Sequence, residues 1–266
     1  MARRHLLYLI ALLALTAAPA TAHPAAPGLT HAQRIRVDKL ISEFENSTPK
    51  IQYCYVAALN DGRGYTVGRA GFTSATGDLL EVAEMYTDEA PGNPLSDLLP
   101  RVRELAANGD GSTDGLENLP QAWADTCKDP HQRAIQDAIV DREYYNPAVK
   151  LWRTYGLERP LSLAAIYDAD IQHGAGPDPD GVPAMLKRTV KRAGGKPGKV
   201  SEKRFLREFI RERRATLAHA HGPSTRAAWA QTVHRADAWL YLWRTKQWSL
   251  ASPLRVHSPE YDLTIK

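Results

Sequence analysis

Apolar side chains recur at helical spacing through most of the chain from Asp129 to Thr245. Asp129 precedes Pro130, and these residue types favour the N-cap and the first position of a helix. Two glycine-rich breaks interrupt the pattern, at residues 174–181 and 194–198. Because an apolar stripe of period 3.6 must be buried against another element, this part of the chain is predicted to be a set of packed helices.

The N-terminal part holds a predicted helix followed by a predicted hairpin. The helix begins with a capping box at residues 30–33, and its apolar stripe ends at Phe44, shortly before a proline. Two β-prone runs, 53–56 and 65–67, flank an Asp-Gly turn at 60–64. The sequence therefore predicts a mainly helical α+β protein with one small hairpin.

Three further boundaries are expected between these parts. Thr76 is predicted to cap a helix that carries Asp78 in its first turn, a favourable place for an anion. Residues 106–120, rich in Gly, Asp and Asn, are predicted to form a surface loop. The helix that begins at Asp129 is predicted to end before Pro147.

Two carboxylates lie where packing alone would not require them. Glu45 falls at the C-terminal end of the first helix, where the macrodipole disfavours an ionised side chain and so suits a proton donor. Asp61 lies in the hairpin turn. Glycoside hydrolysis requires such a pair, one acid to protonate the leaving oxygen and one carboxylate to activate water or attack the sugar. Two solvated surface groups are the alternative.

Short motifs accompany this pair in a fixed order: Glu45-Asn46-Ser47, Asp61-Gly62-Arg63-Gly64-Tyr65-Thr66, Gly71-Phe72-Thr73, Thr76-Gly77-Asp78 and Tyr86-Thr87-Asp88. Their order and spacing resemble the family-46 glycoside hydrolases, the bacterial chitosanases, and weaker matches continue to about Arg226. The resemblance implies a two-lobed, lysozyme-like fold with a small sheet at the cleft. It also implies endo-hydrolysis of the β-1,4 linkages between glucosamine units of chitosan, with inversion.

The resemblance implies roles for individual residues. Glu45 would be the general acid, Asp61 the general base, and Thr66 would help to hold the attacking water. The positions that match the family's sugar subsites are Tyr55, Arg63, Asp78, His173 and Gly174. A carboxylate such as Asp78 can bind a glucosammonium group directly. Arg63 is better suited to hold a catalytic carboxylate in its ionised state than to touch a cationic sugar.

Two charged residues, Asp168 and Arg213, interrupt the apolar stripes of their helices. Because a lone buried charge is very costly, each should have a partner, and the simplest solution is that they meet. The resemblance implies that Asp168, Arg213 and Arg226 form a network that orients Glu45. The alternative is that both helices are rotated and the charges are exposed.

The N-terminus has the features of an export signal. Two arginines precede a short apolar run and a small-x-small site, so residues 1–22 are a predicted signal peptide and 23–266 a single catalytic domain of two lobes. The run is too short to span a membrane comfortably. A secreted or periplasmic protein is expected, and in that compartment Cys54 and Cys127 are predicted to pair, two buried thiols being the alternative.

The distribution of charge along the chain limits the classes of molecule that the protein is expected to bind. The formal net charge is +4, but residues 41–89 hold eight acids against three bases and would attract a polyamine sugar. Residues 187–214 hold twelve bases against three acids without regular aromatic residues, so a solvated helix face is favoured over a nucleic-acid site. His219 and His221 have no supporting ligands at metal-site spacing. No metal, cofactor, nucleic acid or membrane partner is expected, and the protein is expected to be a monomer.

Two rival functions stay open. Another lysozyme-like enzyme could act on peptidoglycan or chitin; lytic transglycosylases use one Glu, so an essential Asp61 would argue against them. A secreted, non-catalytic polysaccharide-binding module is the second rival, and it predicts that replacing Glu45 leaves function unchanged.

Overall fold

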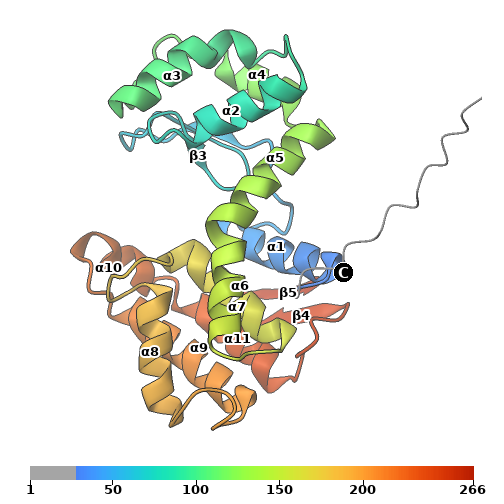
Figure 1. The fold of residues 1–266 in the computed structure, drawn as a ribbon, viewed down its shortest axis with the longest axis vertical. Helices are drawn as coiled ribbons and strands as arrows, with labels where there is room; N and C mark the ends of the chain where they lie inside the picture. Colours follow the sequence, from blue (N-terminus) through green and yellow to red (C-terminus); the bar gives the residue numbers. More distant parts are fainter. Residues whose placement is uncertain (1–27) are drawn as a thin grey trace, which may run out of the picture.

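The structure is a computed structural model that describes residues 28–266, so the predicted signal peptide lies outside the described residues. Figure 1 shows two bodies of mainly helical structure joined by one long helical rod. We call residues 56–140 the upper lobe, and residues 31–46 together with 146–266 the lower lobe. The mainly helical, two-lobed fold class predicted from the sequence is confirmed.

The upper lobe combines a small antiparallel sheet, in the order β1-β2-β3, with short helices that cover it. Its elements are β1 (Val56–Ala58), β2 (Tyr65–Val67), β3 (Phe72–Thr73), α2 (Asp78–Glu89), the 3-10 turn η1 (Ser96–Leu98), α3 (Leu99–Asn108), α4 (Leu119–Thr126) and α5 (Pro130–Val140). Helix α5 packs on α2 and continues downwards as the rod.

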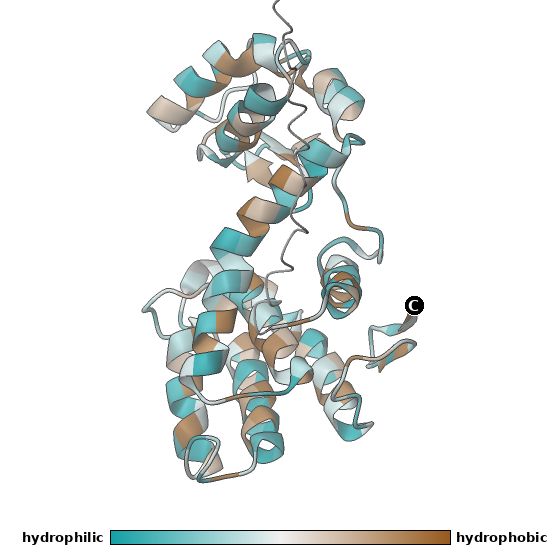
Figure 2. Cartoon of the chain, turned by 45° about the vertical axis from the view of Figure 1, so that its right-hand side comes forward, coloured by the Kyte–Doolittle hydropathy of each residue, from teal (hydrophilic) through white to brown (hydrophobic). Residues whose placement is uncertain are grey.

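The lower lobe is a bundle of helices with a two-stranded sheet at one side. Its elements are α1 (His31–Asn46), α6 (Asn146–Thr154), α7 (Pro160–His173), α8 (Val182–Ala193), α9 (Glu202–Ala218), α10 (Pro223–Ala230), α11 (Val233–Arg244), β4 (Leu254–His257) and β5 (Asp262–Ile265). Figure 2 shows hydrophobic and hydrophilic residues alternating along the helices of both bodies, as amphipathic packing requires. Among the described residues, no helix is long and apolar enough to cross a membrane.

The sequence predicted that the helix beginning at Asp129 ends before Pro147, and this prediction is wrong, because the helical rod continues through Pro147. A π-helical turn, η2 (Asp141–Tyr145), joins α5 to α6, and Pro147 lies in the first turn of α6. A π-helical turn widens the backbone, so the proline ring avoids the carbonyl of the preceding turn. The predicted start of the rod is confirmed, because the Asp129 carboxylate caps it by accepting from the His131 N–H at 2.8 Å.

Helix α1 begins as predicted. The Thr30 hydroxyl accepts a hydrogen bond from the Gln33 N–H at 3.3 Å, and the Gln33 side chain accepts one from the Thr30 N–H at 2.8 Å. The helix ends at Asn46 and is followed by the C-cap residue Ser47, whose φ of 53° is left-handed. Glu45 therefore lies in the last turn, as the sequence indicated.

The hairpin is shifted from its predicted position. Strand β1 begins at Val56, and residues 53–55 are not in a strand, because the Tyr53 carbonyl accepts hydrogen bonds from Trp123 at 3.0 Å and Gln136 at 3.2 Å. Helix α2 is capped by Gly77 and not by Thr76, whose hydroxyl instead donates to the Asp78 carboxylate at 2.6 Å.

The predicted loop at 106–120 is shorter than expected. Helix α3 extends to Asn108, because Val102 and Leu105 are buried, and it ends at Gly109 in the left-handed region. The predicted disulfide between Cys54 and Cys127 is present, with Cα atoms 5.1 Å apart. It closes a loop across 73 residues of sequence, a constraint on the unfolded chain of about 4 kcal/mol.

Candidate active site

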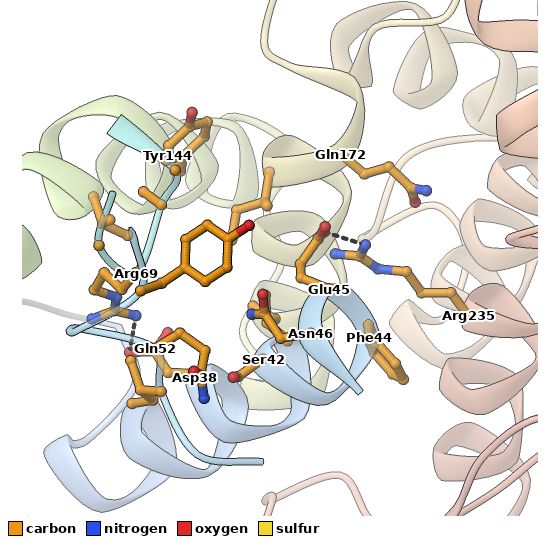
Figure 3. Close-up of a pocket in the computed structure, with 18 of the residues that line it drawn as sticks. Asp38, Ser42, Phe44, Glu45, Asn46, Gln52, Arg69, Tyr144, Gln172 and Arg235 are labelled. Atoms are coloured by element: carbon orange, nitrogen blue, oxygen red, sulfur yellow. Dashed lines mark hydrogen bonds and ion pairs between the residues drawn. The ribbon is translucent and has the colours of Figure 1, made fainter. Parts of the chain in front are cut away.

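A cavity of about 530 Å³ lies between the two lobes. Its walls come from α1 and the segment after it, β2 and the turn after it, the π-helical turn, α7, α10 and α11. Figure 3 shows Glu45 directed into this space towards Arg235. The cavity therefore collects side chains that lie as far apart in the sequence as α1 and α11.

Glu45 reaches the cavity from the last turn of α1. Its side chain is 43% exposed and forms an ion pair with Arg235, which is only 3% exposed. Arg235 also donates from Nη2 and Nε to the Asp168 carboxylate, at 2.6 and 3.0 Å. Arg235, a buried cation held by Asp168, thus orients the accessible carboxyl group of Glu45.

Asp168 is fully buried on α7, where Arg213 and Arg235 both pair with it. The Trp239 indole N–H donates to the same carboxylate at 2.6 Å. Burial alone would raise the pKa of Asp168, but attraction to the two arginines lowers it to about 2. The predicted pairing of Asp168 with Arg213 is confirmed, and exposure of the two charges is excluded.

The second arginine of this network is Arg235, not Arg226 as the resemblance implied. Arg226 is exposed on α10 and donates to the carbonyls of Ala220 at 2.9 Å and His221 at 3.1 Å, which secures the local turn. The signal for Arg235 was present in the sequence. It stands one and two turns before Trp239 and Leu242 on an apolar face, the same break in pattern that marked Arg213.

Asp61 lies in the loop between β1 and β2, beside Arg63. The Arg63 guanidinium donates to the Asp61 carboxylate at 2.6 and 3.0 Å, and the Arg63 backbone N–H donates at 3.1 Å. These hydrogen bonds lower the pKa of Asp61. Arg63 therefore contacts a candidate catalytic carboxylate, as the sequence suggested, and keeps it ionised as a base must be.

Thr66 lies on β2 and lines the cavity. Its hydroxyl oxygen is buried and has no hydrogen-bond partner among the described residues. A buried hydroxyl normally finds a partner, so a hydroxyl on a cavity wall is suited to bind water or a sugar oxygen.

Asp78 is the first residue of α2, and its carboxylate is held in one orientation. One oxygen accepts from the Thr73 N–H at 2.7 Å, the Thr76 hydroxyl at 2.6 Å and the Leu79 N–H at 3.0 Å. Neither Asp78 nor Asp61 is among the residues that line the cavity itself; both belong to the upper lobe.

The three other predicted subsite residues are placed as follows. Tyr55 lines the cavity, and Gly174 ends α7 with a φ of 74°. His173 is buried edge-on against Trp229, and neither ring nitrogen has a partner among the described residues. Burial, with repulsion from Arg213 and Arg235, lowers the pKa of His173 to about 3, so its ring is neutral.

Two further charged features, one of them on the cavity wall, also escaped the sequence analysis. Asp170, also on α7, is buried, and its carboxylate oxygens have no partner among the described residues. Asp38 and Arg69 form a buried ion pair on the cavity wall. In the part of the chain that the structure describes, no group of three or more His, Cys, Asp and Glu side chains could hold a metal ion.

Comparisons with known proteins agree on one family. The model of glycosyl hydrolase family 46 matches residues 39–254. A chitosanase from Bacillus subtilis strain 168 is 44% identical over 237 residues, which cover 89% of this chain and 86% of that protein. A chitosanase from Streptomyces sp. strain N174 is 37% identical over 220 residues, covering 80% of this chain and 78% of that protein.

Solved structures give the same result. The native chitosanase from Bacillus subtilis MY002 superposes with a TM-score of 0.77 at 43% identity, covering 90% of this chain and all of that one. A family-46 chitosanase from Gynuella sunshinyii, solved in complex with chitotetraose, has a TM-score of 0.76 at 43% identity, covering 90% of this chain and 99% of that one.

Proposed function

The chain belongs to glycosyl hydrolase family 46, and from this membership we infer that it is an endo-acting chitosanase, a glycoside hydrolase that cleaves β-1,4 linkages within a chain of glucosamine units. The observation that carries the mechanism is the position of Glu45. Its accessible carboxyl group lies on one wall of the cavity between the lobes, held by a buried arginine, while Thr66 lines the same cavity from the upper lobe.

Glu45 is the proposed general acid. In its protonated form it donates to the glycosidic oxygen as the bond to the leaving sugar breaks. Arg235 and Asp168 fix the direction of the carboxyl group, so little reorganisation is needed during the reaction. They act through Glu45 and are positioning residues.

Asp61 is the proposed general base. Arg63 keeps its carboxylate ionised, so it can take a proton from water. The Thr66 hydroxyl supplies a hydrogen-bond partner that would hold this water against the anomeric carbon. Direct attack by water on the face opposite the leaving group inverts the anomeric centre. It requires a separation of about 6.5–9.5 Å or more between the carboxyl groups, and a spacing of about 5 Å with substrate bound would argue against inversion.

Cationic sugars are bound by the proposed subsite residues Tyr55, Asp78, His173 and Gly174. The preoriented carboxylate of Asp78 can form a charge-assisted hydrogen bond with a glucosammonium group. The neutral ring of His173 does not repel such a cation. We further propose that the protein is exported, with cleavage near His23, because a polysaccharide outside the cell must be degraded there. We also propose that it acts as a monomer.

The test is the viscosity of a chitosan solution over time with the wild type and the variants Glu45→Gln and Asp61→Asn. A fast fall with the wild type and a loss of about 100-fold or more in each variant are expected, because general acid and base groups each contribute that much. Glu43→Gln, two residues earlier on α1, is the matched control and should keep its activity.

The other outcomes separate the rivals. Wild-type protein that leaves chitosan intact but degrades peptidoglycan would refute chitosan as the substrate. An active Glu45→Gln variant would refute the choice of acid, and an active Asp61→Asn variant the choice of base. The anomeric form of the first product, followed by proton NMR, tests inversion.

A further inference from the structure

The wall of the cavity that holds Glu45 also contains an ion pair between the lobes. Asp38 lies on α1, seven residues before Glu45 and on the same face of that helix. Arg69 lies in the turn between β2 and β3, three residues after Thr66. Arg69 Nη2 is 3.1 Å from Asp38 Oδ2, and the side chains are 8% and 7% exposed. Figure 3 shows this contact across the cavity from the Glu45–Arg235 pair.

On the lower-lobe side, Asp38 is fixed by several donors. The Arg34 Nε donates to its two oxygens at 3.0 and 3.1 Å, and the Tyr167 hydroxyl donates at 3.0 Å. Arg34 is itself paired with Asp141 of the π-helical turn at 2.6 Å. The Asp38 carboxylate therefore cannot turn away from Arg69 without breaking contacts to α1 and α7.

On the upper-lobe side, Arg69 is equally restrained. Its other guanidinium nitrogen pairs with Asp137 of α5, and its backbone N–H donates to the Gln136 side chain at 3.0 Å. Gly68 has a φ of 71°, and a Cβ there would lie 2.5 Å from the Gln136 side-chain oxygen and 3.0 Å from Trp123. The turn is thus pressed against α4 and α5, and Arg69 transmits the position of the upper lobe to α1.

A buried ion pair is weak evidence for a purely stabilising role. Desolvation offsets much of the attraction, and apolar side chains of similar volume often serve stability as well or better. A charged pair does constrain direction and distance, because both partners require each other's hydrogen bonds. This pair links the helix that carries Glu45 to the turn that follows the strand of Thr66, so it constrains the distance between these two elements.

We propose that the Arg69–Asp38 ion pair is a positioning device that sets the spacing across the cavity between the acid on α1 and the water-binding side on β2. The inference rests on the proposed function, since it concerns the spacing of that acid and that water. Without the pair, Glu45 can still donate a proton, but the water at Thr66 is no longer held at attack distance. A misplacement of about 1 Å can cost about 100-fold in rate.

The experiment compares kcat and KM on chitosan oligomers for Arg69→Met, Arg69→Lys and the double variant Arg69→Met with Asp38→Leu. We expect kcat to fall about 10- to 100-fold in Arg69→Met with KM changed less than about threefold. Arg69→Lys should recover part of kcat, because it restores the charge that pairs with Asp38. Arg103→Met is the matched control and should behave as wild type, because Arg103 is 58% exposed and pairs with Glu84 on the surface.

The double variant tests positioning without either charge of the bridge. Its kcat should stay low, and because Asp38→Leu also removes the acceptor of Arg34 and Tyr167, it should be no more stable than Arg69→Met. Arg69→Lys, which keeps the charge, answers the question if Arg69→Met does not fold, and a folded Arg69→Lys should have a kcat below that of the wild type. A folded Arg69→Met or double variant with wild-type kcat overturns the inference, as does a loss confined to KM. That failure differs from failure of the proposed function, in which the wild type itself would not cleave chitosan or Glu45→Gln would remain active.

Discussion

Replacing Arg213 with alanine should both destabilise the protein and weaken catalysis. Arg213 is 2% exposed, pairs with Asp168 and donates from Nη2 to the Gln172 side chain at 2.7 Å. The change leaves Asp168 fully buried with Arg235 as its remaining cationic partner. Arg235 must then satisfy Asp168 while it orients Glu45, so the acid is held less firmly.

The size of the effect follows from burial. Removing one partner of a buried ion pair costs about 3–5 kcal/mol. For a chain of this length each kcal/mol lowers the melting temperature by about 2–4 °C, so a fall of roughly 6–20 °C is expected. A loss of activity of about tenfold or more should accompany it, because Glu45 is displaced from its productive orientation.

The dependence of stability on pH should also change in this variant. The folded pKa of Asp168, about 2, lies below its ordinary value of 3.8, so this carboxylate stabilises the fold above about pH 4 and the contribution is lost as the pH falls towards 2. With Arg213 removed the pKa of Asp168 rises, and acid unfolding should begin at a higher pH.

Thermal unfolding by circular dichroism and chitosan hydrolysis measure both effects. Arg214→Ala is the matched control, because Arg214 is the next residue, 47% exposed, and pairs with Asp237 at the surface. Exposed pairs contribute about 1 kcal/mol or less, so the melting temperature of the control should change by less than about 4 °C. An Arg213→Ala variant as stable and as active as the control would refute the network.

Two further predictions concern pH. Arg63→Met should move the acidic limb of the kcat/KM profile to higher pH, because the hydrogen bonds that lower the pKa of Asp61 are lost; an unmoved limb would contradict Asp61 as the base. Burial without a partner raises the pKa of Asp170 to about 7, above its unfolded value, so this group destabilises the fold as the pH rises from about 4 to 7. Asp170→Asn should therefore melt above the wild type at pH 8 but not at pH 4, and an equal difference at both values would show that Asp170 does not titrate as described.

The sequence determined the features whose cause is local or whose alternatives are few. The capping box before α1, the Asp129 cap at the start of the rod and the export-type cysteine pair each follow from short-range backbone chemistry or from the lack of another partner. The pairing of Asp168 with Arg213 was also accessible, because a charge within an apolar stripe must find an opposite charge.

Only the tertiary structure decided which distant side chains share the cavity. Arg235 lies 190 residues from Glu45 in the sequence. Asp38 belongs to the lower lobe and Arg69 to the upper lobe, and they pair across the cavity. Periodicity places each of these residues on a helix face or in a turn, but it does not give the rotation and crossing of one element against another. Those follow from how whole faces pack, so Arg226 and Arg235 were both available from the sequence, and packing brought Arg235 to the acid.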